Sequence, residues 1–164
     1  MAMKQHDGKD LIRAFAPGDG EWLAAIYRRA VEKRTGDDYS DLQRSAWISI
    51  APSGEVIEAF YGDGRLAFVA VDEREEPVGF SDLEKDGHIQ FLYVAPEAAG
   101  RSIGTRLIAT LEQAAREEGL DRLYSEASET ALPVFLKSGF KRLQRRDLMI
   151  DGVAIHNYSV EKRL

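Results

Sequence analysis

The stretch "VAPEAAGRSIGTRLI", residues 94–108, has the residue types and spacing of an anion site. A strand-like end leads into a glycine-bearing bend and then into an amphipathic helix. A helix start leaves about four N–H groups without partners and carries a partial positive charge. Gly100 and Gly104 bracket this start, and glycine lets a ligand approach the backbone closely. Because Arg101 can add a charge-assisted contact, the stretch predicts a phosphate cradle.

The pattern alone leaves a plainer interpretation open, in which Gly100 makes a turn and Gly104 packs close to the sheet. The stretch has neither the Lys-Ser/Thr pair of a nucleoside triphosphate loop nor the three glycines of the dinucleotide fingerprint. The residues around it must therefore decide which nucleotide, if any, binds there.

Composition narrows the class of protein. The chain has 164 residues, 44% apolar and 30% charged, which is typical of one soluble globular domain; we take residues 1–164 as a single domain with its core at about 10–162. The net charge of −6 argues against a nucleic-acid partner. The absence of cysteine excludes disulfides, cysteine-rich zinc sites and a cysteine nucleophile, and we expect no metal. No apolar run approaches the roughly 18 residues that span a bilayer, so we expect a cytoplasmic protein without a membrane partner.

The elements that must position the cradle read as mixed α/β. We expect a strand at Asp10–Phe15, then helices capped by Asp19, Ser40 and Ser53. Strands are then expected at Arg65–Asp72, Val78–Leu83, His88–Val94 and Arg122–Ala127.

The remaining elements follow the cradle. One apolar stripe at helical spacing predicts a helix ended by Gly119, with Ile103, Leu107, Leu111 and Ala114 on its buried face. A short helix runs through Phe135, and Asp151-Gly152 is typical of a hairpin turn. We therefore predict an α/β (α+β mixed) fold, a single mixed and mostly antiparallel sheet with helices on both faces.

Two motifs in this order resemble the GNAT superfamily of N-acetyltransferases. The family's first motif, Q/R-x-x-G-x-G/A, falls on "AGRSIG" at residues 99–104, where Ala99 replaces Gln or Arg and Ser102 replaces the first motif glycine. The second motif falls on "SETALPVFLKSGF" at residues 128–140, where Ser128 stands at the Asn position and Phe135 at the Tyr position. The resemblance covers most of the chain.

The resemblance implies an acyl-CoA N-acyltransferase fold in which two central parallel strands splay apart around acetyl-CoA. It places the diphosphate on amides of Gly100, Arg101, Ser102, Ile103, Gly104 and Thr105. The pantetheine arm would pair with the backbone of Leu92, Tyr93 and Val94, and the Val94 amide would stabilise the developing oxyanion. Ser128 and Phe135 would lie beside the pantetheine and the sulfur.

The implied reaction is direct attack of a neutral amine on the thioester in a ternary complex, which needs a proton acceptor and a proton donor. Glu126 and His88 are the principal candidates for the base, and His156 is a weaker one. Since Phe135 lacks the hydroxyl that many family members place near the sulfur, Tyr93, Ser128 or water would protonate the thiolate, or the thiolate leaves unassisted.

The acceptor pocket in this family is built from the first helices and the strand loops. Tyr39 and Trp47 lie there beside Asp38 and Asp41, and could hold a cation by ring faces and charge. Most aromatic residues at helical spacing are core, which is the alternative.

We therefore expect an acetyl-CoA-dependent N-acetyltransferase acting on a small-molecule amine. A non-catalytic CoA-binding module and a protein N-acetyltransferase are the alternatives. Many relatives dimerise, and the last hairpin offers an edge at which two copies could form a homodimer.

Overall fold

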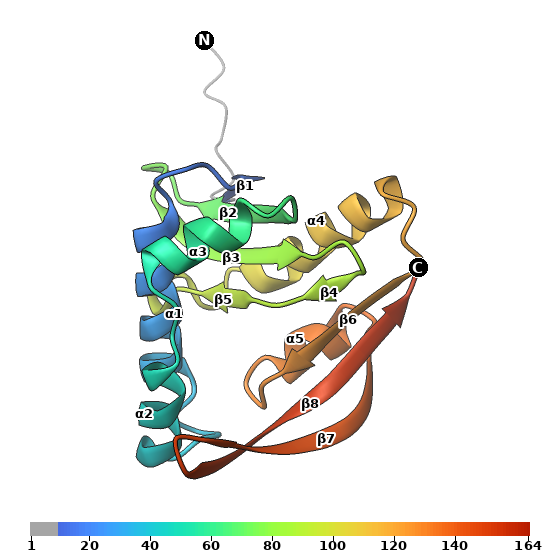
Figure 1. The fold of residues 1–164 in the computed structure, drawn as a ribbon. Helices are drawn as coiled ribbons and strands as arrows, with labels where there is room; N and C mark the ends of the chain where they lie inside the picture. The colour runs from blue at the N-terminus through green and yellow to red at the C-terminus, as the bar shows by residue number, and fades with distance from the viewer. Residues whose placement is uncertain (1–9) are drawn as a thin grey trace.

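The computed structural model describes residues 10–164, in which helices pack around two sheets (Figure 1). The strands are β1 (Leu11–Ala14), β2 (Leu66–Val71), β3 (Pro77–Leu83), β4 (His88–Ile89), β5 (Leu92–Val94), β6 (Arg122–Ala127), β7 (Lys141–Ile150) and β8 (Val153–Arg163). The helices are α1 (Gly20–Arg34), α2 (Asp41–Ser49), α3 (Gly54–Tyr61), α4 (Ile103–Glu117), α5 (Leu132–Lys137) and the 3₁₀ turn η1 (Pro96–Ala98).

The α/β fold class is confirmed, but the strands form two sheets of four where we expected one sheet. One has the order β1-β2-β3-β5 and the other β4-β6-β8-β7. The division falls inside the segment expected as one strand, His88–Val94, which breaks at Gln90 and Phe91. Asp82 stabilises the break, because its Oδ1 accepts hydrogen bonds from the N–H groups of Gln90 (2.8 Å) and Phe91 (3.1 Å). Those two amides consequently have a partner outside any strand ladder.

The expected splay of two parallel strands is present. β4 pairs with β6 in parallel only at His88↔Tyr124 and Ile89↔Ser125. The Ser125 hydroxyl donates to the Ile89 carbonyl (2.6 Å) at the end of this contact. Beyond it, β5 pairs with β3 and β6 with β8, so β5 and β6 diverge (Figure 1). The divergence leaves one edge of each strand without a neighbouring strand.

Helix α4 packs against both sheets and confirms the predicted apolar stripe. Ile103 and Leu107 belong to the cluster beneath the first sheet, and Ile108 and Leu111 to the cluster beneath the second. All four are at most 2% exposed. Since burying such a side chain contributes roughly 1.5–3 kcal/mol, α4 is a strong connection between the halves. Its first turn is thereby held beside the diverging strands.

Two of the three predicted helix caps are confirmed. Ser40 forms a capping box with Gln43, and the Ser53 hydroxyl accepts a hydrogen bond from the Val56 N–H. Asp19 stands at the N-cap position of α1 as predicted, but its side chain makes no capping hydrogen bond. Its carboxylate instead accepts hydrogen bonds from Arg13 and from the Ala16 N–H (2.8 Å), which bind it to the preceding strand and turn.

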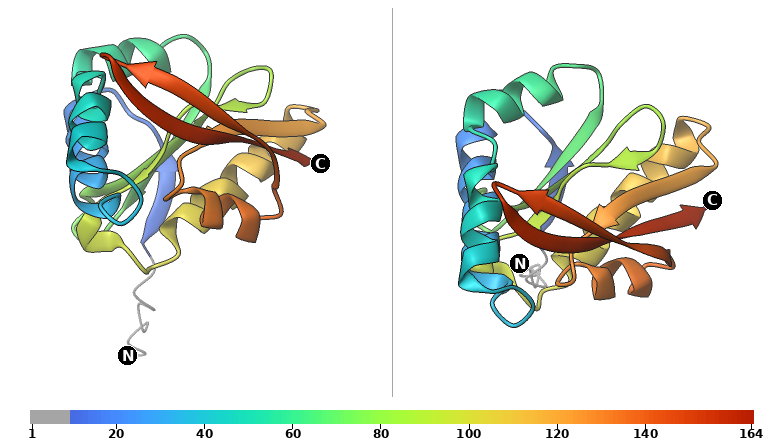
Figure 2. Two further views of the ribbon diagram at one scale, coloured as in Figure 1. Left: turned by 90° about the horizontal axis from the view of Figure 1, so that it is seen from below. Right: turned by 60° about the horizontal axis from the view of Figure 1, so that its bottom comes forward.

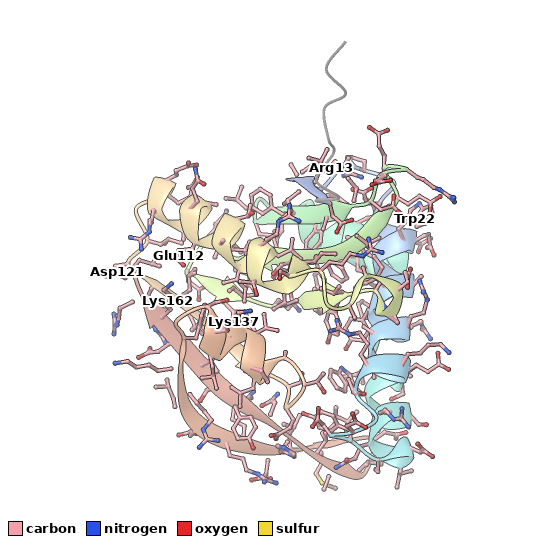
Figure 3. All side chains as sticks on the ribbon, turned by 180° about the vertical axis from the view of Figure 1, so that it is seen from behind. Arg13, Trp22, Glu112, Asp121, Lys137 and Lys162 are labelled. Carbon is pink, nitrogen blue, oxygen red and sulfur yellow. The ribbon has the colours of Figure 1, made fainter. Side chains whose placement is uncertain are left out.

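The final hairpin turns at Asp151-Gly152 as predicted, with φ of 48° and 75° at these residues. Its tip reaches α2, where the Gln43 side chain donates to the Ala154 carbonyl (3.0 Å), and both views in Figure 2 show this approach. At the other end of the hairpin, Lys162 donates to Glu112 of α4 (2.7 Å), as labelled in Figure 3. The hairpin therefore spans from α2 to α4 across the side where β5 and β6 diverge.

Candidate active site

The bend before α4 presents a run of unpaired amides. The N–H groups from Gly100 to Thr105 donate to no residue within 10–164. Gly100 has a φ of 81° and Ser102, the residue that caps α4, has a φ of 60°. Left-handed residues at a helix start turn successive N–H groups toward one side, which is the geometry of an anion nest. The site predicted from the sequence is therefore formed by the main chain.

Gly104 and Arg101 contribute differently from the sequence expectation. A Cβ at Gly104 would lie 3.2 Å from Val134 Cγ1, so this glycine allows close packing of α4 on α5, as the plainer interpretation held. Arg101 is engaged elsewhere, because its guanidinium donates to Asp10 (3.2 Å) and to the Glu97 carbonyl (3.2 Å). It does not line the adjacent cleft, whereas its neighbours in the bend do.

This cleft, which we call the cofactor cleft, contains about 1150 Å³ of space that is partly open to solvent. The bend forms one wall, β5 a second and the start of α5 a third. Arg34 and Lys137 also line it, and neither was found from the sequence, since cations in a last helical turn are ordinary. Figure 3 labels Lys137 at the end of α5. Arg34 donates to the Val94 carbonyl (3.2 Å), and burial lowers the pKa of its guanidinium.

The exposed edge of β5 supplies main-chain groups to the cofactor cleft. The Ala95 N–H donates to the Val78 carbonyl (2.8 Å), which sets the alternation of the β3–β5 ladder. By that alternation the main-chain groups of Tyr93 form hydrogen bonds with β3, while the N–H groups of Leu92 and Val94 point away from β3. We expected the main-chain groups of Leu92, Tyr93 and Val94 all to face the ligand. The register leaves only those of Leu92 and Val94 free to do so.

A second cavity, the acceptor pocket, contains about 750 Å³, partly open to solvent. It lies between the end of α2, β6 and the tip of the β7–β8 hairpin. The two cavities adjoin, because five residues line both: Trp47, Leu92, Tyr93, Ser128 and Ala131.

Tyr39 and Trp47 both line the acceptor pocket, with ring centroids 5.4 Å apart. Trp47 Nε1 donates to the Tyr27 hydroxyl (2.9 Å), which fixes the indole between the cavities. The acidic residues expected beside them do not line the pocket. Asp38 accepts from Thr130 and Asp41 pairs with Arg44, so the carboxylate for a cation must come from elsewhere.

That carboxylate is Glu126, which lines the acceptor pocket from β6. Its Oε2 lies 2.7 Å from His88 Nε2, and His88 Nδ1 lies 2.7 Å from Glu84 Oε1. The bond to Glu126, with help from Glu84, raises the pKa of His88 to about 9, and the imidazolium in turn lowers the pKa of Glu126. His88 is therefore cationic at neutral pH and lines neither cavity. It is placed to orient Glu126.

The other predicted site residues lie at the junction of the cavities. The Ser128 hydroxyl accepts from the Ala131 N–H (3.0 Å), which is local turn chemistry, yet the residue also lines both cavities. Phe135 is 2% exposed and lines the acceptor pocket. Burial raises the pKa of the Tyr93 phenol well above its usual value, so Tyr93 carries its proton at neutral pH.

His156 was given a minor place from the sequence but lines the acceptor pocket. Its Nε2 lies 2.6 Å from Glu129 Oε2, and its ring lies 5.6 Å from that of Tyr39. Neighbouring Asn157 lines the pocket too. The alternation of residues in the last strand could not indicate that these two residues line a pocket, because the facing helix α2 lies more than a hundred residues earlier in the chain.

No helix within residues 10–164 is both long and apolar enough to cross a membrane. Over the same range, no group of three or more His, Cys, Asp or Glu side chains is arranged to hold a metal ion.

Comparison with known proteins matches the sequence model described as acetyltransferase (GNAT) domain to residues 35–162. The chain is 31% identical over 148 residues to "Uncharacterized N-acetyltransferase YafP" of Escherichia coli (strain K12), covering 90% of this chain and 91% of that protein. It is also 31% identical over 137 residues to peptidyl-lysine N-acetyltransferase YjaB of the same organism, covering 84% and 86%. A crystal structure of a GCN5-related N-acetyltransferase from Rhodopseudomonas palustris is similar, with a TM-score of 0.86 and 36% identity over 95% of this chain and 96% of that one.

Proposed function

The chain belongs to the GNAT family of acetyltransferases and is an acetyl-transferring enzyme, and we propose that it carries acetyl from acetyl-CoA directly to a small-molecule amine in a ternary complex. One observation carries the proposal. The unpaired amides from Gly100 to Thr105 open onto a cleft that adjoins a carboxylate-bearing pocket.

The cofactor cleft fits acetyl-CoA by its donors. The amide run at the start of α4 would hold the diphosphate, and Arg34 and Lys137 would add positive charge. The free N–H group of Leu92 would pair with the pantetheine arm, which leaves the free N–H group of Val94 for the thioester carbonyl. Ser102 contributes its amide whatever its side chain, so the loss of the motif glycine leaves the cradle in place.

The reaction forms a C–N bond from the amine to the acetyl carbon and breaks the C–S bond. Glu126 takes the proton that the amine loses, and its bond to the His88 imidazolium holds it in place. The Val94 N–H stabilises the negative charge that develops on the carbonyl oxygen. The thiolate receives a proton from Tyr93 or Ser128, the two hydroxyl-bearing residues that line both cavities, since Phe135 has no hydroxyl.

A small acceptor is favoured over a protein by the contact of the hairpin tip with α2. The Gln43–Ala154 hydrogen bond joins the two elements that flank the acceptor pocket. A peptide substrate would need an open groove at this place. The relation to a peptidyl-lysine N-acetyltransferase favours the alternative, a protein lysine acceptor.

Two measurements test the proposal. Calorimetric titration with acetyl-CoA, ATP and NAD should give tight binding for the CoA species alone. Thiol release from acetyl-CoA should then require an amine, with small amines used faster than lysine peptides. Equal binding of ATP, or faster transfer to peptides, would contradict the corresponding half of the proposal.

A further inference from the structure

The acceptor pocket has an unusual charge inventory. Of its lining residues, all of which lie in the described part of the chain, Glu126 is the sole carboxylate and none is Lys or Arg. His156 is the other ionisable group apart from two tyrosines, and it is bound to Glu129, which does not line the pocket. A ligand in the pocket therefore meets one carboxylate and no unpaired cation.

The Glu126 carboxylate stays effective although His88 is bound to it. His88 lies between two carboxylates, those of Glu84 and Glu126, and Glu84 is also paired with Arg65 (3.6 Å), so Glu126 is the carboxylate of this group that faces the pocket. The Asp86 carboxylate also lies near His88, because it accepts a hydrogen bond from the main-chain N–H of His88 (3.1 Å). Tyr124 packs against the imidazole with ring centroids 4.9 Å apart, and Arg146 places a positive charge near Glu126. One ammonium group is the complement of the single carboxylate that lines the pocket.

The rest of the wall mixes apolar side chains with uncharged polar ones, the latter including Gln90, Ser125, Ser128 and Asn157. Aliphatic side chains come from the end of α2 and from the hairpin: Ile50, Leu148, Ile150 and Ile155. Trp47 and Phe135 add aromatic surface. Against such a wall each methylene of a ligand that leaves water tightens binding about fourfold.

We propose that the acceptor is a primary amine on an otherwise uncharged skeleton, carrying a single positive charge when free in water. This names the substrate class of the proposed function and rests on it. An amino acid is excluded because its carboxylate would find no Lys or Arg in the pocket. A diamine or polyamine is excluded because its second ammonium would be desolvated against aliphatic side chains.

Matched pairs of amines test the proposal by thiol release from acetyl-CoA. 2-Phenylethylamine and phenylalanine differ by one carboxylate, and hexylamine and 1,6-diaminohexane by one ammonium. We expect kcat/KM at least about tenfold higher for the first member of each pair, since a buried unpaired charge is a large penalty. A preference for the second member of either pair, or for a lysine peptide over hexylamine, would overturn the proposal and leave acetyl transfer intact. Transfer to none of these amines would remove the proposed function as well.

A specificity switch gives an independent test. Ile150→Glu places a second carboxylate on the pocket wall and should move the hexylamine to 1,6-diaminohexane ratio toward the diamine by about tenfold. Met149→Glu is the matched control, because Met149 precedes it on the opposite face of β7, is 64% exposed and does not line the pocket. Leu148→Glu serves as the second variant if Ile150→Glu does not fold. An unchanged ratio in the folded variant, or the same change in the control, would refute the assignment.

Discussion

The cofactor cleft and the acceptor pocket share a wall but are built from different materials. The cofactor cleft takes its key donors from main-chain groups, the amides of the bend before α4 and the edge of β5. The acceptor pocket takes its chemistry from side chains, with Glu126 from β6 and apolar residues from α2 and the hairpin. Because every residue except proline offers a main-chain N–H group, the first region should tolerate substitution where the second should not. Comparing the two by mutation is therefore informative.

The largest effect should follow Glu126→Gln in the acceptor pocket. General acid–base catalysis contributes about 10²–10⁴-fold, so kcat should fall at least about a hundredfold. The affinity for acetyl-CoA should stay unchanged, since Glu126 does not line the cofactor cleft. Steady-state kinetics and calorimetry measure the two quantities. Glu161→Gln on β8 is the control, and an equal loss there, or a normal kcat for Glu126→Gln, would refute the assigned role.

Trp47 lines both cavities, so a substitution at this residue should weaken the binding of acetyl-CoA and of the amine together. Removing the indole with Trp47→Ala takes an aromatic contact of about 0.5–1.5 kcal/mol from each ligand, which corresponds to a KM increase of up to about tenfold for both. Trp22→Phe is the control, because Trp22 is 48% exposed on α1 (Figure 3). If the amine KM stayed unchanged in the folded variant, the acceptor role of Trp47 would be wrong.

The His88–Glu126 pair should appear as a pH dependence of stability. The folded pKa of about 9 lies above the unfolded value of about 6.5, so the stabilisation is complete below pH 6.5 and is lost as pH rises through about 9. We expect about 1 kcal/mol after allowing for solvent screening. His88→Gln should remove this slope in urea titrations between pH 6 and 10. A slope that persists in the variant would assign it to other groups.

The two regions also differ in how far the sequence could predict them. Gly100 and the stripe on α4 predict the cradle locally, because turn residues and helical periodicity act over a few positions. The break at Gln90 was missed because its cause, Asp82, is on another strand. Ile50 and Ile150 both line the acceptor pocket, and no local sequence pattern predicts that residues so far apart in the chain lie together. Arg34 lines the cofactor cleft and was missed because a cation in the last turn of a helix is ordinary in a sequence.

Lys137 tests the charged part of the cofactor cleft. An exposed cation beside a phosphate contributes at most about 1 kcal/mol, so Lys137→Ala should weaken acetyl-CoA binding about threefold to fivefold, and less at high salt. The kcat at saturating acetyl-CoA should stay unchanged. Lys141→Ala, on exposed β7, is the control. A lower kcat in Lys137→Ala would mean that the charge of Lys137 affects the reaction as well as the binding of acetyl-CoA.

The smallest effect concerns the one bend residue whose side chain departs from the family motif at a strained position. Ser102 adopts a φ of 60°, where a residue with a Cβ is disfavoured by about 1–2 kcal/mol, while glycine loses about 0.5–1 kcal/mol of chain entropy. Ser102→Gly should therefore raise the free energy of unfolding by about 0.5 kcal/mol in urea titrations, with acetyl-CoA affinity unchanged because the amide remains. The same substitution at Ser138, where φ is −85°, should lower stability instead. Loss of acetyl-CoA affinity in Ser102→Gly would show that the serine hydroxyl contacts phosphate, so that the cofactor cleft depends on side chains too.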